Sequence, residues 1–249
     1  MTQNIYDDPA FFEGYGRLDR SVDGLAAAPE WPSLRAQLPD MRGLRAVDLG
    51  CGYGWFCRWA RGAGARSVLG LDVSEKMLAR ARADTEDAAI EYRRADLAGL
   101  DLAGLDLPAE AFDLAYSSLA LHYVEDVAPL FATIHRALAP GGRFVFSTEH
   151  PIYMASARPR WIAMEDGQKS WPVDSYQNEG RRVTNWLAEG VVKYHRTIGT
   201  TLNHLIGAGF AIRHVEEWGP TEAQIKATPA LREECERPMF LLVAAGKGS

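Results

Sequence analysis

The sequence predicts a doubly wound α/β fold, a mostly parallel sheet with helices on both faces. Short apolar segments alternate with helical segments from residue 44 to residue 149, the pattern of parallel sheets. The first apolar segment runs into glycines at alternate positions, 50, 52 and 54. The alternation stops over residues 149–199, where short β-like stretches are separated by turn residues. We therefore expect one α/β core that carries a β-rich insertion after its fifth strand.

The chain divides into four parts on this reading. Residues 1–40 contain scattered aromatic side chains and end in the proline-marked stretch PEWPSLRAQLPD, which predicts a lid segment of short helices. Residues 41–148 form the ligand-binding core, and residues 149–199 form the insertion. Residues 200–249 return to the core sheet.

The strands and helices of the core are predicted from apolar runs and from the residues that begin or end them. Strands are predicted at 44–49, 67–73, 89–97, 112–119 and 143–149. A first helix is predicted at 53–63, and a second begins after Ser74, which serves as its N-cap. A third helix begins at residue 127 and is expected to end at Pro140-Gly141-Gly142.

The insertion starts where the fifth strand ends. Its short β-like runs, separated by QNEG and AEG, predict antiparallel hairpins. Open α/β folds build substrate lids at the carboxyl ends of their strands, so we expect the insertion to be such a lid. A helix at 200–210 and two strands at 210–218 and 239–245 complete the chain.

Composition narrows the function classes. The 249 residues carry a net charge of −6, and no run of Lys and Arg is long enough to predict binding to nucleic acid or an anionic membrane. No apolar run reaches transmembrane length and the N-terminus has no leader pattern, so we expect a cytoplasmic protein. The three cysteines form no CxxC pair, which favours reduced, buried thiols and no metal site.

The glycine turn predicts which ligand the core holds. A dinucleotide fingerprint that starts at Gly50 needs a third glycine at position 55, which is Trp55. Asp48 precedes the turn, Asp72 follows Gly50 by 22 residues, and Asp96 ends the third strand. Three acids at the ends of consecutive strands suit a ligand with a sugar, a base amine and positive charge, rather than phosphates.

Five motifs in register carry a family resemblance. VDLGCGYG, GLDVS, RADL, FDLAYSSLALHYVED and LAPGGRFVFS resemble those of the class I S-adenosylmethionine-dependent methyltransferases, and among them the small-molecule methyltransferase family. The resemblance covers residues 44–148 closely and reaches the C-terminus in outline. It implies a seven-stranded, Rossmann-like sheet whose terminal strand is antiparallel, with S-adenosylmethionine (SAM) as cofactor and S-adenosylhomocysteine (SAH) as product.

The resemblance also implies roles for the residues that hold the methionine and ribose parts of SAM. Asp48, Gly50 and Gly52 line the methionine end, where backbone groups of the turn contact its amino and carboxylate groups. Asp72 takes the ribose diol. The carbonyl of Ser117 faces the ammonium group.

The adenine is expected on the next two strand ends. Val73 and Met77 pack on its face, while Asp96 and Leu97 meet its edge. Two residues of the N-terminal segment are expected to close over the donor, Tyr15 and Arg20.

Methyl transfer from a sulfonium needs alignment and exclusion of water more than acid–base chemistry. A hydroxyl or ammonium acceptor needs a base, and histidine is the usual one. Our order of candidates is His150, then His195, then His122. For each, a purely hydrogen-bonding role stays open, and transfer by proximity alone would need no base.

The acceptor is expected to be a small molecule. Aromatic residues crowd the N-terminal segment and the insertion, where they either stack on a planar acceptor or shelter an amine, or else form the lid's own core. Three hypotheses remain: an N- or O-methyltransferase, an NAD(P)-dependent oxidoreductase, and a non-catalytic SAM-binding module. The oxidoreductase is disfavoured by Trp55 and Asp48. Monomer and homodimer both stay open.

Overall fold

A seven-stranded sheet organises the computed structural model, which describes residues 3–98 and 108–248. Its strands in chain order are β1 (Arg45–Leu49), β2 (Ser67–Asp72), β3 (Ile90–Arg94), β4 (Phe112–Ser118), β5 (Leu138–Glu149), β10 (Ala211–Glu217) and β11 (Phe240–Gly246). Their order across the sheet is β10-β11-β5-β4-β1-β2-β3. The predicted seven-stranded doubly wound sheet is confirmed.

The pairing explains where a ligand can enter. β1 pairs in parallel with both β2 and β4, and β4 pairs in parallel with β5. The chain thus winds outwards in two directions from β1, which opens a crevice at the carboxyl ends of β1 and β4. β11 runs antiparallel to β5 and β10, so the predicted antiparallel end of the sheet is also confirmed.

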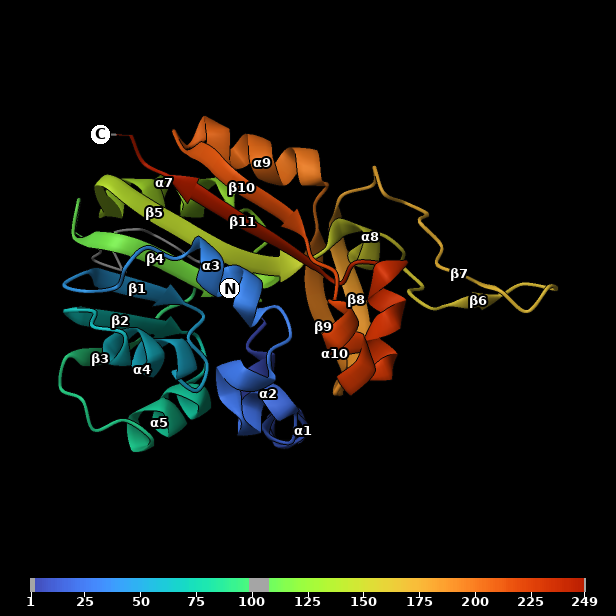
Figure 1. Cartoon of the computed structure of the whole chain (residues 1–249), viewed down its shortest axis with the longest axis horizontal. Helices are drawn as coiled ribbons and strands as arrows, with labels where there is room; N and C mark the ends of the chain where they lie inside the picture. Colours follow the sequence, from blue (N-terminus) through green and yellow to red (C-terminus); the bar gives the residue numbers. More distant parts are fainter. Residues whose placement is uncertain (1–2, 99–107, 249) are drawn as a thin grey trace.

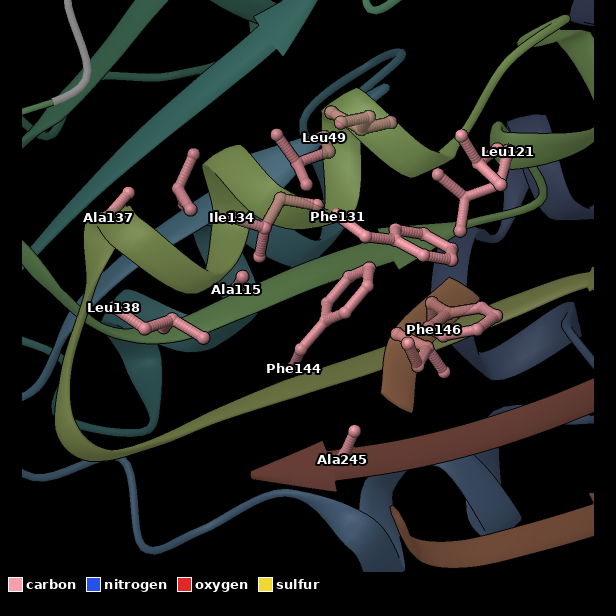
Figure 2. Close-up of a cluster of buried hydrophobic side chains, with 14 of the residues drawn as sticks. Leu49, Ala115, Leu121, Phe131, Ile134, Ala137, Leu138, Phe144, Phe146 and Ala245 are labelled. Carbon is pink, nitrogen blue, oxygen red and sulfur yellow. The ribbon is translucent and has the colours of Figure 1, made fainter. Parts of the chain in front are cut away.

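Helices cover both faces of the sheet (Figure 1). Those on the core are α3 (Trp31–Gln37), α4 (Trp55–Gly62), α5 (Glu75–Ala83), α7 (Ala128–Ala137) and α9 (Ile198–Gly207). On one face Phe131 and Ile134 of α7 pack with Phe144 and Phe146 of β5, as Figure 2 shows. Burying each of these side chains contributes about 1.5–3 kcal/mol, so this layer holds α7 on β5.

One boundary in this region differs from the sequence prediction. We expected Pro140-Gly141-Gly142 to end the helix, but α7 already ends at Ala137 and β5 begins at Leu138. Leu138 pairs with Phe112, and the register then shifts before Arg143 pairs with Leu114. The proline and glycines therefore lie in an irregular strand start, where the unpaired proline nitrogen is tolerated.

The remaining elements gather beyond one end of the sheet (Figure 1). The N-terminal ones are η1 (Ile5–Asp7), α1 (Pro9–Gly16), α2 (Asp19–Val22) and η2 (Gly24–Ala27), and η3 (Leu121–Tyr123) follows β4. Those of the insertion are α8 (Pro151–Met154), β6 (Ile162–Ala163), β7 (Lys169–Ser170), β8 (Gly180–Trp186) and β9 (Ala188–His195). The antiparallel pairs β6–β7 and β8–β9 confirm the predicted hairpins.

Two short helices between β10 and β11 escaped the sequence analysis. They are α10 (Glu222–Ala227) and η4 (Pro229–Cys235). Thr221 and Gln224 form a reciprocal capping box at the start of α10, a local signal that the sequence did carry. None of the helices in the described ranges is long and apolar enough to cross a membrane.

Candidate functional site

A cavity of about 500 Å³ lies at the carboxyl ends of the parallel strands. The N-terminal segment, the β8–β9 hairpin and the segment after α10 complete its wall. The predicted cofactor residues that line it are Tyr15, Arg20, Asp48, Gly50, Gly52, Asp72, Val73, Met77, Asp96 and Leu97. Residues far apart in the sequence thus lie around one cavity, as we expected from their positions at the ends of consecutive strands.

The glycine turn is held open by backbone geometry and by Asp72. Gly50 and Gly52 have φ angles of +80° and +51°, which residues with a Cβ rarely adopt. A Cβ on Gly52 would meet nothing within 4 Å, so the absence of a side chain leaves space at the cavity wall. The Asp72 carboxylate accepts hydrogen bonds from the amides of Gly52 and Ser74, both at 2.9 Å. Asp72 therefore fixes the turn while its remaining lone pairs stay available to a ligand.

Asp48 is the most desolvated acid of the site. It is 2% exposed, and its Oδ2 accepts a hydrogen bond from the Cys57 thiol at 3.3 Å. Burial raises the pKa of Asp48 to about 7, and the nearby charge of Asp72 adds to this. In the described part of the chain no cationic side chain pairs with Asp48. A positively charged ligand group would supply the missing partner.

The wall on the far side of the turn is built on α5. Ser74 caps the helix by accepting from the Met77 amide, which places Met77 at the cavity. The Asp7 carboxylate accepts from the Ser74 hydroxyl at 2.6 Å and from the Lys76 amide at 3.2 Å. The N-terminal segment is therefore tied to the core at this wall.

Ser117 lies next to the cavity without lining it, and the contact of its carbonyl with the ammonium group stays a prediction. Its hydroxyl donates to the Leu49 carbonyl at 2.8 Å, and the residue is fully buried outside the cavity lining. The chain turns directly after β4, where Leu119 has a φ of +54°. Ser118, Leu119 and Ala120, the next three residues, line the cavity.

His150, the first candidate base, lies outside the cavity. Its Nδ1 accepts from the Ile152 amide at 3.0 Å, which caps α8. Its Nε2 therefore carries the proton and donates to Glu217 on β10 at 2.9 Å. Both ring nitrogens are thus used to join α8 to the sheet, and the expectation that His150 faces the acceptor is corrected.

His195, the second candidate, is also placed elsewhere. It is fully buried, and its Nε2 donates to the Tyr176 carbonyl at 2.8 Å. Lys193, two residues earlier on the same face of β9, lines the cavity instead. The hairpin therefore presents an ammonium group where a histidine was expected.

Of the three histidines, His122 lines the cavity. Burial lowers its pKa well below the ordinary value, and the positive charges of Lys193 and Arg196 lower it further, so the ring is neutral. Its Nδ1 accepts from the Glu149 amide at 3.4 Å, and its Nε2 lies 4.0 Å from Glu149 Oε1. The lone pair that a base needs is therefore engaged by the backbone.

Glu149 and Lys193 form a buried ion pair at the cavity wall that the sequence analysis did not assign. Lys193 Nζ donates to Glu149 Oε1 at 2.5 Å, and the two side chains are 4% and 13% exposed. The Lys193 ammonium also lies 5.0 Å from the centre of the Trp186 ring. β9 buries alternate residues from Val191 to His195, and the residue between these two at a buried position is Lys193. A lysine at a buried position of a strand is the sequence signal for this ion pair.

The aromatic residues of the N-terminal segment and the insertion lie in two kinds of place. Four of them line the cavity: Tyr6, Tyr15, Tyr153 and Trp186. Trp161 and Trp171 instead pack with Tyr153 around the Arg237 guanidinium, with ring distances of 5.5, 4.5 and 4.8 Å respectively. The insertion therefore forms a small core of its own around an internal cation.

The N-terminal segment closes one side of the cavity. Tyr15 packs edge-on against Tyr53, with ring centres 5.8 Å apart. Arg20 donates to both carboxylate oxygens of Glu30, at 2.9 and 3.1 Å, so its charge is already balanced. The Gln3 side chain donates to the Gly190 carbonyl at 2.9 Å, which joins this segment to the β8–β9 hairpin.

Comparison with known proteins agrees with this architecture. Residues 47–146 match the methyltransferase domain family. A crystal structure of an S-adenosylmethionine dependent methyltransferase from Mesorhizobium loti is 66% identical, with a TM-score of 0.84 over 90% of this chain and 100% of the other. An uncharacterized protein of Haemophilus influenzae is 36% identical over 98% of this chain and 97% of its own length.

A malonyl-[acyl-carrier protein] O-methyltransferase of Pectobacterium atrosepticum is 31% identical over 68% of this chain, which spans 64% of that protein's length. The chain belongs to the class I S-adenosylmethionine-dependent methyltransferases. Its cofactor is S-adenosylmethionine, as in the homologous methyltransferases.

The residues present fit this cofactor. The buried Asp48, which pairs with no cationic side chain of the described residues, suits a ligand with ammonium and sulfonium charges, and the open space at Gly52 suits close approach to the backbone. Trp55 Nε1 is a further buried donor that has no partner in the described structure and belongs to a residue of the cavity wall. No group of residues suited to hold a metal ion occurs within 3–98 and 108–248.

Two of the three cysteines are buried thiols, as the sequence predicted, and the third is not. Cys51 and Cys57 are free and buried at the glycine turn, as expected, whereas Cys235 is exposed. Burial raises the pKa of both turn thiols, which keeps them protonated and unreactive.

Proposed function

We propose that this protein transfers a methyl group from SAM to a nitrogen or oxygen atom of a small molecule by in-line displacement. One observation carries the proposal. A single cavity runs from Asp48 and Asp72 at the glycine turn to Glu149 and Lys193 at the end of β5. Donor and acceptor can therefore occupy one water-poor space.

SAM supplies a methyl carbon that its sulfonium charge already activates. The acceptor atom donates a lone pair to that carbon, and the sulfur retains the electron pair of the broken bond, so no redox partner is needed. The contribution of the chain is alignment and exclusion of water. His122 Nδ1 already accepts a hydrogen bond from the backbone, so it is not free to act as a base. A neutral amine attacks with its own lone pair and releases a proton to solvent after transfer, whereas a hydroxyl would have to lose its proton to another group or to water.

Two segments would enclose the acceptor. We infer that residues 1–40 and residues 149–199 act as lids, because both line the cavity and Gln3 bridges them. The Val192 amide donates to Gln3 Oε1 at 2.8 Å, so both hydrogen bonds of the Gln3 side chain go to the backbone of the β8–β9 hairpin. Residues 41–148 and 200–249 form the sheet beneath.

Formation of SAH tests the proposal. The protein is incubated with SAM and a mixed panel of amines, phenols, alcohols and carboxylic acids, and SAH is measured by mass spectrometry. We expect SAH with at least one nitrogen or oxygen acceptor, and its loss in the Asp72→Ala variant. SAM binding without acceptor-dependent SAH across the panel would favour a non-catalytic SAM-binding module.

A further inference from the structure

The acceptor end of the cavity carries an ion pair that is complete within the protein. Lys193 Nζ on β9 donates to Glu149 Oε1 at the end of β5, at 2.5 Å, and both residues line the cavity. His122 Nε2 lies 4.0 Å from the same oxygen, but its ring is neutral, as described above. The pair therefore presents two opposite charges to a ligand and no net charge.

The other buried or half-buried charged side chains of this wall are paired as well. Glu234 of η4 accepts from Arg237 at 2.6 Å, and Arg20 of the N-terminal segment donates to Glu30 at 2.9 Å. A charged ligand group would therefore meet no unbalanced opposite charge in the buried part of this wall, within the described residues. Moving an ion from water into such a place is unfavourable, whereas an uncharged group avoids this penalty.

Aromatic rings lie beside the ion pair. The centres of the Trp186 and Tyr123 rings lie 5.0 and 6.0 Å from Lys193 Nζ. The Tyr6 hydroxyl donates to the Tyr123 hydroxyl at 3.2 Å, so these two polar groups bind each other. All three rings line the cavity. Such a wall suits a ligand that carries a ring, because aromatic side chains offer apolar area and edge or face contacts.

Both partners of the pair can still bind a ligand group. An ammonium has three N–H donors, and Lys193 uses one of them, for Glu149, among the described residues. Glu149 Oε2 makes no hydrogen bond there, and it stays accessible because the side chain keeps 13% exposure. A hydroxyl can donate to this oxygen and accept from the ammonium. A ligand ammonium cannot accept, and a ligand carboxylate cannot donate.

We propose that the Glu149–Lys193 pair selects an uncharged, ring-bearing acceptor whose hydroxyl donates to Glu149 Oε2 and accepts from Lys193. This assignment rests on the proposed function and deepens it, because it names a hydroxyl oxygen as the methylated atom. As that oxygen bonds the methyl carbon, its proton passes to Glu149, and the electron pair of the broken carbon–sulfur bond stays on the sulfur. Lys193 keeps its charge and stabilises the oxygen while the proton leaves. Glu149 then releases the proton to solvent.

Binding to the SAH-saturated protein tests the assignment without a known acceptor. The probes are three matched compounds, 2-phenylethanol, phenethylamine and phenylacetate, measured by ligand-observed NMR and calorimetry at pH 8. At this pH the amine is protonated and the acid is ionised. We expect the alcohol to bind at least tenfold more tightly than either charged probe. Equal or tighter binding of the amine or the carboxylate, or no binding of any probe, would overturn the assignment.

Two variants that each remove one charge of the pair should shift this preference in opposite directions. Lys193→Met leaves the Glu149 carboxylate unpaired, so phenethylamine should gain at least tenfold in affinity relative to 2-phenylethanol. Glu149→Gln leaves the Lys193 ammonium unpaired, so phenylacetate should gain at least tenfold relative to the alcohol. SAH affinity within about twofold of wild type shows that each variant is folded.

Matched controls remove the same charges outside the cavity lining. Glu189→Gln changes an exposed position of β9, and Lys226→Met changes an exposed position of α10. Both should keep the wild-type order of the three probes. Folded variants of the pair that keep this order, or that shift it in one direction, would overturn the role of the pair, and if one variant does not fold, the other decides.

The proposed function and the hydroxyl assignment fail differently. Failure of SAH to bind the wild-type protein would contradict both together. Tight SAH binding with a charged probe bound as tightly as the alcohol would overturn the hydroxyl assignment alone and leave methyl transfer intact.

Discussion

Replacing Asp48 with asparagine tests how the buried carboxyl of this site changes the stability of the protein with pH. Asp48 is buried at 2% exposure, and its folded-state pKa is raised from 3.8 to about 7 by burial. The folded protein therefore keeps this proton up to about pH 7, whereas the unfolded chain releases it near pH 3.8. As pH rises through that window, the contribution of Asp48 to stability falls, and it stays at the lower level above pH 7.

The magnitude follows from the two pKa values. For each pH unit between the two pKa values, the free energy of unfolding of the wild type falls by about 1.4 kcal/mol. From pH 5 to the folded pKa of about 7 this is a loss of about 3 kcal/mol, which the Asp48→Asn variant does not undergo. Relative to wild type, it should gain about 3 kcal/mol between pH 5 and pH 8, or roughly 6–12 °C in Tm for a domain of this size.

Thermal unfolding of the ligand-free proteins at pH 5 and pH 8 measures this difference. The comparison between variant and wild type cancels the other titrating groups. Asp23→Asn is the matched control, because it removes a carboxylate from an exposed position and should show no gain. A difference between Asp48→Asn and wild type that stays constant from pH 5 to pH 8 would refute the reasoning.

Three further variants probe the site. Gly52→Ala should cost about 1–2 kcal/mol of stability at its φ of +51° and weaken SAH binding more than tenfold in calorimetry, and unchanged affinity would place the ligand away from the turn. Asp72→Ala should abolish SAH binding and lose about 1–3 kcal/mol in denaturant unfolding, since two amides lose their acceptor. His150→Ala should lower Tm through the lost cap of α8 while SAH affinity and turnover are kept, and a selective loss of turnover would restore His150 as a base.

The strand ends could be predicted because their signals are local. Asp48 lies one residue before the end of β1 and Asp72 ends β2, and the parallel pairing of these two buried strands brings their ends together. The glycine turn and the caps of the following helices are equally local. The cofactor half of the cavity therefore follows from short stretches of sequence.

The acceptor half depends on contacts between distant segments, which no local pattern specifies. Glu149 and Lys193 are 44 residues apart and meet only when the hairpin folds over the end of β5. His150 turned away because α8 begins directly after it and uses its ring as a cap. Ser117 is buried with its hydroxyl on the Leu49 carbonyl, and the three residues after it line the cavity.

A crystal structure of the protein with SAH tests the central claim most directly. We predict that the amino acid part lies at Gly50 and Gly52 beside Asp48, that the ribose contacts Asp72, and that the sulfur faces Glu149. SAH bound in the opposite direction, or outside this cavity, would contradict the account of both halves of the site.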